Sequence, residues 1–222
     1  MAPSLVFPDP RAAADLLTFA RRAARLADPA VRLRAASGTM AVSAAPLSPR
    51  GFGDDTPTVL AMRFLACDPE LVCDLVVDAG DLSAGSEAGT IGLPDSGVSA
   101  AWAGISPPRS GWDAAGTLSS AALSDATRRG VADVAAALPG SPGEDLVRTV
   151  RGAIWGRADA TLNGVVAGAA FAADALGFLA DEEPVSVFRT GTWTRLTLAR
   201  GHVLVRTGNP TGLTAVRSTG RS

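Results

Sequence analysis

The sequence predicts an α+β protein in which antiparallel β meanders pack against about four helices. Segments of alternating apolar and polar residues, joined by short glycine turns, lie near both ends of the 222-residue chain. Such alternation is typical of strands with one buried face. Between them, apolar residues recur three or four positions apart, the spacing of an amphipathic helix. With 47% hydrophobic residues, the chain can bury a sizeable core without disulfides or metals.

The N-terminal part is expected to form a short strand followed by a helix. Ser4–Phe7 is the strand, and Asp9-Pro10 supplies a helix N-cap with proline at the first helical position. Apolar residues at Ala13, Leu16, Ala20 and their neighbours then lie on one helical face. The helix should end near Asp28-Pro29.

A hairpin and two further strands should follow this helix. Residues 31–35 and 40–44 alternate around Ser37-Gly38, which predicts a two-residue turn. That turn places Leu33 opposite Val42 and Arg32 opposite Ser43. The next strands are expected at Thr58–Cys67 and Val72–Asp78.

The middle of the chain is predicted to be irregular and then helical. Glycine-rich sequence indicates flexible connections near 80–97 and 104–116, with a strand at Val98–Ala103 between them. Helices are expected at Thr117–Leu138, from Ser141-Pro142-Gly143-Glu144 onward, and at Val165–Ala180. Ser141-Pro142-Gly143-Glu144 matches a capping box with proline at the first position. The buried stripe of the second helix would be Leu146, Val147, Val150 and Ile154.

The C-terminal third predicts a three-stranded meander over Val185–Arg189, Thr192–Ala199 and His202–Arg206. Turns at Thr190-Gly191 and Arg200-Gly201 would pair Phe188 with Trp193 and His202 with Ala199. One face would be apolar, carrying Val185, Val187, Thr194, Leu196, Leu198, Val203 and Val205. The wetter face would carry Phe188, Trp193, Arg195, Thr197, Leu204 and Arg206.

The pattern of a helix followed by a meander occurs twice and indicates two pseudo-repeated halves. A chance likeness of short hairpins is the alternative. We expect a single α+β domain over residues 1–216 and a tail at 217–222. Nine acids face one arginine between Asp54 and Asp95, whereas six arginines and no acid follow Val185. The two sheet segments should therefore lie side by side in one fold, or meet between subunits.

The side-chain inventory excludes most familiar enzyme chemistries. The chain has no lysine or tyrosine, one histidine and two cysteines, so a P-loop, a Schiff base and a four-ligand zinc site are excluded. His202 is expected at a solvent edge, and Cys67 and Cys73 in core-like strands. We therefore expect no cofactor, and lean against an enzyme.

Carboxylates leave one enzymatic alternative open. Asp74, Asp78 and Asp81 are close in sequence, and Asp54-Asp55 precede a strand. A hydrolase-type enzyme could use such a cluster with a metal ion. The simpler interpretation is that alternating aspartates form the solvated face of a strand.

Tryptophan beside arginine is the stronger signal of a binding surface, because both residue types are enriched where interfaces concentrate their energy. Trp112 follows Arg109 in a proline-rich loop, and Trp193 and Arg195 share a strand face. The predicted binding residues are Arg109, Trp112, Phe188, Trp193, Arg195 and Arg206. The alternative is that a helix covers Phe188 and Trp193 while Arg195 extends outward.

The stretches Pro107–Trp112 and Thr192–Arg206 resemble those of uncharacterised proteins from high-GC actinobacteria. That resemblance extends over most of the chain and implies no particular fold or activity. It agrees with the alanine- and arginine-rich composition.

The leading hypothesis is a cytoplasmic, non-catalytic binding or protein-interaction module that uses the 109–112 loop and the wetter meander face, with self-association as one option. A net charge of −2 and a pI of about 5.4 favour neither nucleic acid nor a membrane surface as partner. The most apolar segment, 165–180, is shorter than the roughly 20 residues of a membrane span. RNA binding by the basic C-terminal sheet, with Phe188 and Trp193 as stacking platforms, is a second alternative. It depends on which face of the 185–206 sheet the helices cover.

Overall fold

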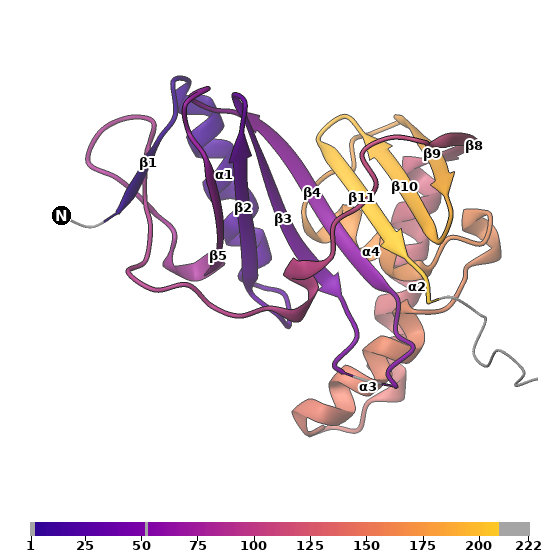
Figure 1. The fold of residues 1–222 in the computed structure, drawn as a ribbon. Helices are drawn as coiled ribbons and strands as arrows, with labels where there is room; N and C mark the ends of the chain where they lie inside the picture. Colours follow the sequence, from indigo (N-terminus) through magenta and orange to yellow (C-terminus); the bar gives the residue numbers. More distant parts are fainter. Residues whose placement is uncertain (1–2, 52, 209–222) are drawn as a thin grey trace, which may run out of the picture.

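One eight-stranded antiparallel sheet lies at the centre of the computed structural model, which describes residues 3–51 and 53–208 (Figure 1). Its strand order is β5-β2-β3-β4-β11-β10-β9-β8. The strands are β2 (Ala30–Ala36), β3 (Thr39–Leu47), β4 (Thr58–Ala66), β5 (Cys73–Asp78), β8 (Asp113–Ser119), β9 (Pro184–Thr190), β10 (Trp193–Leu198) and β11 (Gly201–Arg206). A small separate sheet contains β1 (Ser4–Val6), β7 (Thr90–Gly92) and β6 (Ser83–Ala84).

The helices that pack on the large sheet all cover the same face of it (Figure 1). α1 (Pro10–Ala23) lies over β2, β3 and β4, and α4 (Ala167–Ala175) lies over β3, β4 and β11. α2 (Ser120–Ala137) packs against α4. The main hydrophobic core fills the space between these helices and the sheet, and includes the stacked rings of Phe19 and Phe178, with centroids 6.2 Å apart. None of the α-helices in the described ranges covers the opposite face of the sheet.

The fold confirms the predicted class, including the two similar halves. In each half a helix precedes a three-stranded meander: α1 precedes β2-β3-β4, and α4 precedes β9-β10-β11. The sheet order is symmetrical about the contact between β4 and β11, the last strand of each meander. The acidic and basic sheet segments therefore lie side by side within one chain. The predicted tail at 217–222 lies outside the described residues.

The N-terminal hairpin has the predicted register. Arg32 lies opposite Ser43 and Leu33 opposite Val42. Ser37 and Gly38 adopt φ angles of 51° and 77°, the left-handed conformation that a two-residue hairpin turn of this type requires.

The C-terminal meander has the predicted faces but different partners. Phe188 lies opposite Arg195, not Trp193, and His202 lies opposite Thr197, not Ala199. Both pairings differ from the prediction by two residues, because the turns lie one residue away from the predicted positions. A shift of two leaves every side chain on the same face. The face assignment therefore survives the error in register.

Several predictions for the middle of the chain were wrong. Residues 98–103 form no strand; instead a 3-10 helix, η2, occupies Ala101–Gly104. Residues 113–119, predicted as loop and helix start, form β8 and pair with β9. The segment 80–97 contains β6, β7 and the 3-10 helix η1 (Ala79–Asp81). These pairings depend on strands far away in the sequence, which local patterns do not report.

α3 (Glu144–Trp155) projects away from the sheet (Figure 1). Its predicted capping box is wrong, because Gly143 is the N-cap and makes no side-chain cap. The predicted buried stripe is also wrong in part: Ile154 is buried, but Leu146 is 43% exposed. The helix is anchored at its C-terminal end, where Trp155 stacks on Phe171 with ring centroids 4.8 Å apart.

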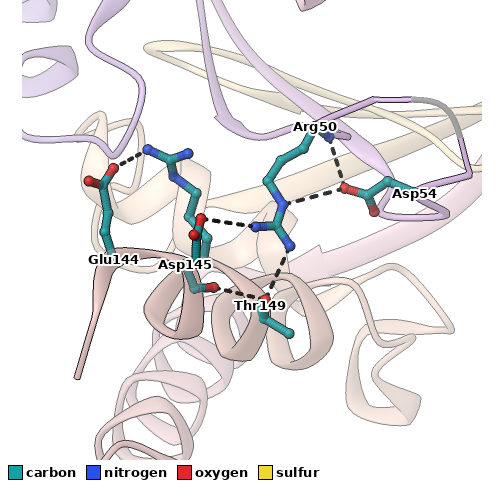
Figure 2. A network of polar contacts seen from close by, with 6 residues as sticks. Arg50, Asp54, Glu144, Asp145 and Thr149 are labelled. Carbon is teal, nitrogen blue, oxygen red and sulfur yellow. Dashed lines mark hydrogen bonds and ion pairs between the residues drawn. The ribbon is translucent and has the colours of Figure 1, made fainter.

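A polar network links the first turns of α3 to the loop after β3 (Figure 2). The Arg50 guanidinium donates to Thr149 Oγ1 at 3.1 Å and lies 3.7 Å from an Asp145 oxygen. The backbone N–H of Arg50 donates to Asp54 at 2.8 Å. Exposed ion pairs of this kind contribute at most about 1 kcal/mol each, so the network positions α3 more than it stabilises the fold.

No helix in the described ranges is long and apolar enough to cross a membrane.

Gly130→Ala should destabilise the protein, although alanine is normally better than glycine by about 1 kcal/mol in a helix. A Cβ at Gly130 would lie 2.1 Å from the Trp155 ring, too close for any side chain. We expect urea denaturation to show a loss of about 1–3 kcal/mol. In a Trp155→Leu background the same substitution should lower the free energy of unfolding by much less. An equal cost in both backgrounds would contradict the packing argument.

Candidate binding groove

The face of the sheet that the α-helices leave open is crossed by the linker, defined here as residues 93–112, which connects β7 to β8 and contains η2 (Figure 1). Its path begins at the edge of the sheet, where the Val98 N–H donates to the Val76 carbonyl at 2.9 Å. Trp102, only 3% exposed, then packs in a second hydrophobic cluster with Ala30, Leu60 and other residues of this face. The linker therefore takes the place of a helical layer.

Two polar contacts fix the linker at Trp102. The indole Nε1–H of Trp102 donates to Asp28 at 3.0 Å. The next residue, Ala103, accepts a hydrogen bond at its carbonyl from Arg32. Arg32 also forms a bidentate pair with Asp74, with both N–O distances 2.7 Å. The hydrogen bonds from Arg32 hold the pKa of the Asp74 carboxyl below its ordinary value.

A groove with a volume of about 540 Å³ lies between the linker and the strands β2, β3, β4, β11 and β10. Its floor is a row of directly opposed residues, one from each neighbouring strand: Arg32, Ser43, Met62 and His202. A second row contains Arg34, Ala41 and Phe64. The wall is Ile105–Arg109 together with Trp112. The groove therefore runs across the strands and along the linker.

Positive charge collects at the two ends of this groove. Arg32 and Arg34 lie at the β2 end, and Arg195 lies at the β10 end. Arg109 is close to this second end along the chain, since it follows Pro108, whose carbonyl accepts from the Trp112 ring that lies against Arg195. No aspartate or glutamate is among the described residues that line the groove. Between the two ends lie the apolar side chains of Met62 and Phe64 together with Ser43 and His202.

Arg195 is held between two aromatic rings. Its guanidinium carbon lies 4.6 Å from the ring centroids of both Trp112 and Phe188, which is close enough for cation–π attraction on both sides. The Nε atom is buried and has no hydrogen-bond partner. Desolvation lowers the pKa of this arginine. Trp112 is itself fixed by a hydrogen bond from its Nε1–H to the Pro108 carbonyl at 3.1 Å.

The six predicted binding residues do not all lie together. Arg109, Trp112 and Arg195 line the groove, and Phe188 packs behind Arg195. Trp193 is only 8% exposed, within the same cluster as Trp102. Arg206 is exposed but lies outside the groove lining.

The alternative of a helix covering Phe188 and Trp193 is wrong, since the α-helices occupy the opposite face. Trp193 is instead buried with Trp102 of the linker, and Phe188 lies against Arg195.

Sequence reasoning missed the β2–β4 side of the groove. Arg32 and Arg34 alternate with apolar residues, which predicts their exposure but not their distance from Arg195. Phe64, whose side chain is 51% exposed, was predicted to lie in a strand but not to belong to a binding surface. Its exposed aromatic ring, beside a strand with alternating arginines, is the feature that could have indicated the groove.

His202 is half-buried in the groove, so its predicted place at a solvent edge is wrong. β11 pairs with β4 and is therefore a central strand. The ring contacts Phe64 with centroids 5.6 Å apart, and Nδ1 lies 3.2 Å from Thr197 Oγ1. Burial, followed by the charge of Arg195, lowers the pKa of His202 below 6.5.

The candidate carboxylates have structural partners. Asp78 accepts from the Gly80 N–H at 2.7 Å, and Asp54 accepts from the backbone N–H groups of Arg50 and Thr56. Over 3–51 and 53–208, no three aspartate, glutamate, histidine or cysteine side chains gather as a metal site would require. Cys67 and Cys73 are free thiols, and burial raises the pKa of both.

Two family models divide the chain at the linker. Residues 1–104 match a domain of unknown function, DUF8010, and residues 107–210 match another, DUF8185. The matched segments correspond to the two halves of the fold, although the sheet is continuous across them. A comparison with curated protein sequences gives no match.

Two solved structures, one named as a DNA polymerase III beta subunit and one as a DNA polymerase sliding clamp, have a similar fold. A protein from Eubacterium rectale assigned as a DNA polymerase III beta subunit has a TM-score of 0.51 and 10% identity over 95% of this chain. The DNA polymerase sliding clamp of Bacillus subtilis has a TM-score of 0.50 and 10% identity over 96%. The chain spans 66% of the length of each. At this identity the likeness concerns the fold alone.

Trp102→Ala should detach the linker from the sheet. The residue is almost fully buried, and removing such a side chain costs about 3–5 kcal/mol. Urea denaturation should show this loss, and limited proteolysis should cut near residue 102 sooner. Val98→Ala in the same linker, where the side chain is 42% exposed, should change stability by about 0.5 kcal/mol or less. Equal losses for the two variants would contradict a fixed linker.

His202 should make folding stability depend on pH. Because its pKa is lower in the folded protein than in the unfolded chain, the unfolded chain binds the proton more readily. The stability is therefore full above the unfolded pKa near 6.5 and falls as the pH drops below it. Urea denaturation of the protein and of His202→Gln at several pH values should show a smaller loss in the variant. Parallel curves would contradict the lowered pKa.

Proposed function

We propose that this protein is a non-catalytic protein-interaction module whose groove accepts a short extended segment of a partner protein. The observation that carries the proposal is that one groove is lined both by apolar side chains such as Met62 and Phe64 and by Arg109 and Arg195, which have no carboxylate partner among the described residues. Arginine and tryptophan are frequent where binding energy is concentrated, and Arg195 is sandwiched between Trp112 and Phe188. The proposed location is the cytoplasm, in keeping with the two free cysteines.

The dimensions of the groove suit a peptide. The lining spans five adjacent strands, from β2 to β10. Four spacings of about 4.8 Å give a length of about 19 Å. An extended chain advances about 3.3 Å per residue, so about six residues would fill the groove.

The lining favours binding over catalysis. His202 is the one imidazole in the chain, and Ser43 lies in the same row of the floor. Met62 of β4 separates them, so their backbones are about 10 Å apart. A nucleophile and its base need to be within hydrogen-bond distance. A carboxylate hydrolase is the weaker candidate, because Asp54, Asp74 and Asp78 are already occupied by structural contacts.

The similar fold of polymerase subunits supports a role in an assembly. One of the two solved proteins is named as a subunit and the other as a sliding clamp of DNA polymerase. For nucleic-acid binding by this chain, the expected stacking platforms are poorly available: Trp193 is buried, and Phe188 stacks on Arg195. We therefore favour a protein partner.

Selection from a random peptide display library on the full chain would test this proposal. The matched variants are Ala41→Phe, which fills the groove without changing charge, and Ala115→Phe, at an exposed position of β8. Selected peptides should bind the protein and Ala115→Phe alike, and bind Ala41→Phe at least about tenfold more weakly, a difference of about 1.4 kcal/mol.

Two results would contradict the proposal. One is a set of peptides that bind Ala41→Phe as well as the unaltered protein. The other is a selection that enriches nothing above background. Sedimentation of the protein alone would show whether a second copy competes for the groove.

A further inference from the structure

We infer that the groove recognises a segment with an acidic side chain at each end and apolar side chains between them, about six residues in all. This inference rests on the proposed function and specifies the chemistry of the partner. It follows from where the charges of the groove lie rather than from their number.

At the β10 end the two arginines have no acidic partner within the described residues. Neither Arg195 nor Arg109 has a carboxylate oxygen within 4.0 Å there. The planar guanidinium of Arg195 is fixed by Trp112 and Phe188, and Nε finds no partner in the protein. A partly desolvated, immobilised guanidinium gains more from a carboxylate than a mobile surface one does. An anionic group of a ligand would therefore bind favourably at this end.

At the β2 end two arginines share one carboxylate. Asp74 is engaged closely by Arg32, at 2.7 Å, whereas its distance to Arg34 is 3.8 Å, beyond a hydrogen bond. Arg32 also donates to the Ala103 carbonyl. Arg34 therefore keeps donors free for a ligand, and one positive charge at this end is not balanced by Asp74.

Between the ends, Met62 and Phe64 provide apolar surface, and the Phe64 side chain is 51% exposed. Ser43 and His202 flank Met62 in the same row of the floor. Apolar ligand side chains there would bury apolar surface on binding, which favours association.

This distribution of charge separates a peptide from a nucleic acid. A single strand of DNA carries a phosphate at every nucleotide, and so would place charge over Met62 and Phe64 as well as at the ends. Burying an anion against apolar groups is unfavourable. A peptide can instead carry carboxylates only where the arginines lie.

The test uses peptides selected on the full chain from a random dodecapeptide library, then synthesised with their acids or with glutamine in place of each acid. Fluorescence anisotropy should show that replacing either acid weakens binding by about tenfold, as expected for a charge-assisted hydrogen bond. A higher salt concentration should weaken binding of the acidic peptides and leave binding of the glutamine peptides unchanged.

Protein variants assign the acids to the two ends. Arg195→Met and Arg109→Met should each weaken binding of the acidic peptide by about tenfold and leave binding of its glutamine version unchanged. Arg109 is exposed, so its variant tests this end even if Arg195→Met folds poorly. Arg206→Met, an exposed arginine on the same sheet face but outside the groove, is the matched control and should change nothing.

The outcomes separate this inference from the proposed function. Peptides that bind the groove with no excess of acids, and lose nothing on glutamine replacement, overturn the inference and leave the interaction module standing. If no selected peptide is sensitive to Ala41→Phe, both fail. A single-stranded oligo(dT) dodecamer that binds more tightly than the peptides and is blocked by Ala41→Phe also overturns the inference in favour of nucleic acid.

Discussion

The pairing of β4 with β11 is the contact on which the rest of this structure depends. Met62 lies opposite His202 and Thr58 opposite Arg206, with the pairs between them in register. This pairing joins the final strands of two similar halves and turns two meanders into one eight-stranded sheet. Once the sheet is continuous, a single helical layer can cover one face of it, and the other face needs a second cover.

The linker supplies that second cover, but only in part. Its Trp102 buries apolar residues of the first half, and its Trp112 reaches Arg195 of the second half. Linker residues pack most closely over Ala30, Ala45, Leu60 and Leu204. The neighbouring row through Ser43, Met62 and His202 remains open as the groove floor. The groove thus results from covering one face of a wide sheet with a single linker segment rather than with a layer of α-helices.

The fold could be predicted from the sequence where the signal was local. Turn residues at Ser37-Gly38 set the first hairpin, and the alternation in the C-terminal meander assigned both faces correctly. The meander turns were misplaced by one residue, so Phe188 was paired with Trp193 instead of Arg195. Faces survived this error because an even shift in register leaves them unchanged.

The groove itself could not be predicted, because it depends on distant contacts. β4 and β11 are separated by more than half of the chain, and no local sequence pattern indicates that they pair. Without that pairing His202 was placed at an edge, and Arg34 could not be related to Arg195. The burial of the linker could not be predicted either. Trp102 was expected in a strand beside a loop, whereas its side chain is buried against the sheet. The loop arginine, Arg109, and its neighbour Trp112 were chosen as candidate binding residues from their residue types alone, and both line the groove.

The central claim is that partners bind on the face of the sheet that the linker covers. Hydrogen–deuterium exchange of the full chain, with and without a selected peptide, tests this most directly because it reports every backbone region at once. Added peptide should slow exchange in 103–112 and at the strand ends around Ala41, Phe64 and His202, and leave α2 and α3 unchanged. Slower exchange confined to the helices, with the linker unaffected, would contradict the account.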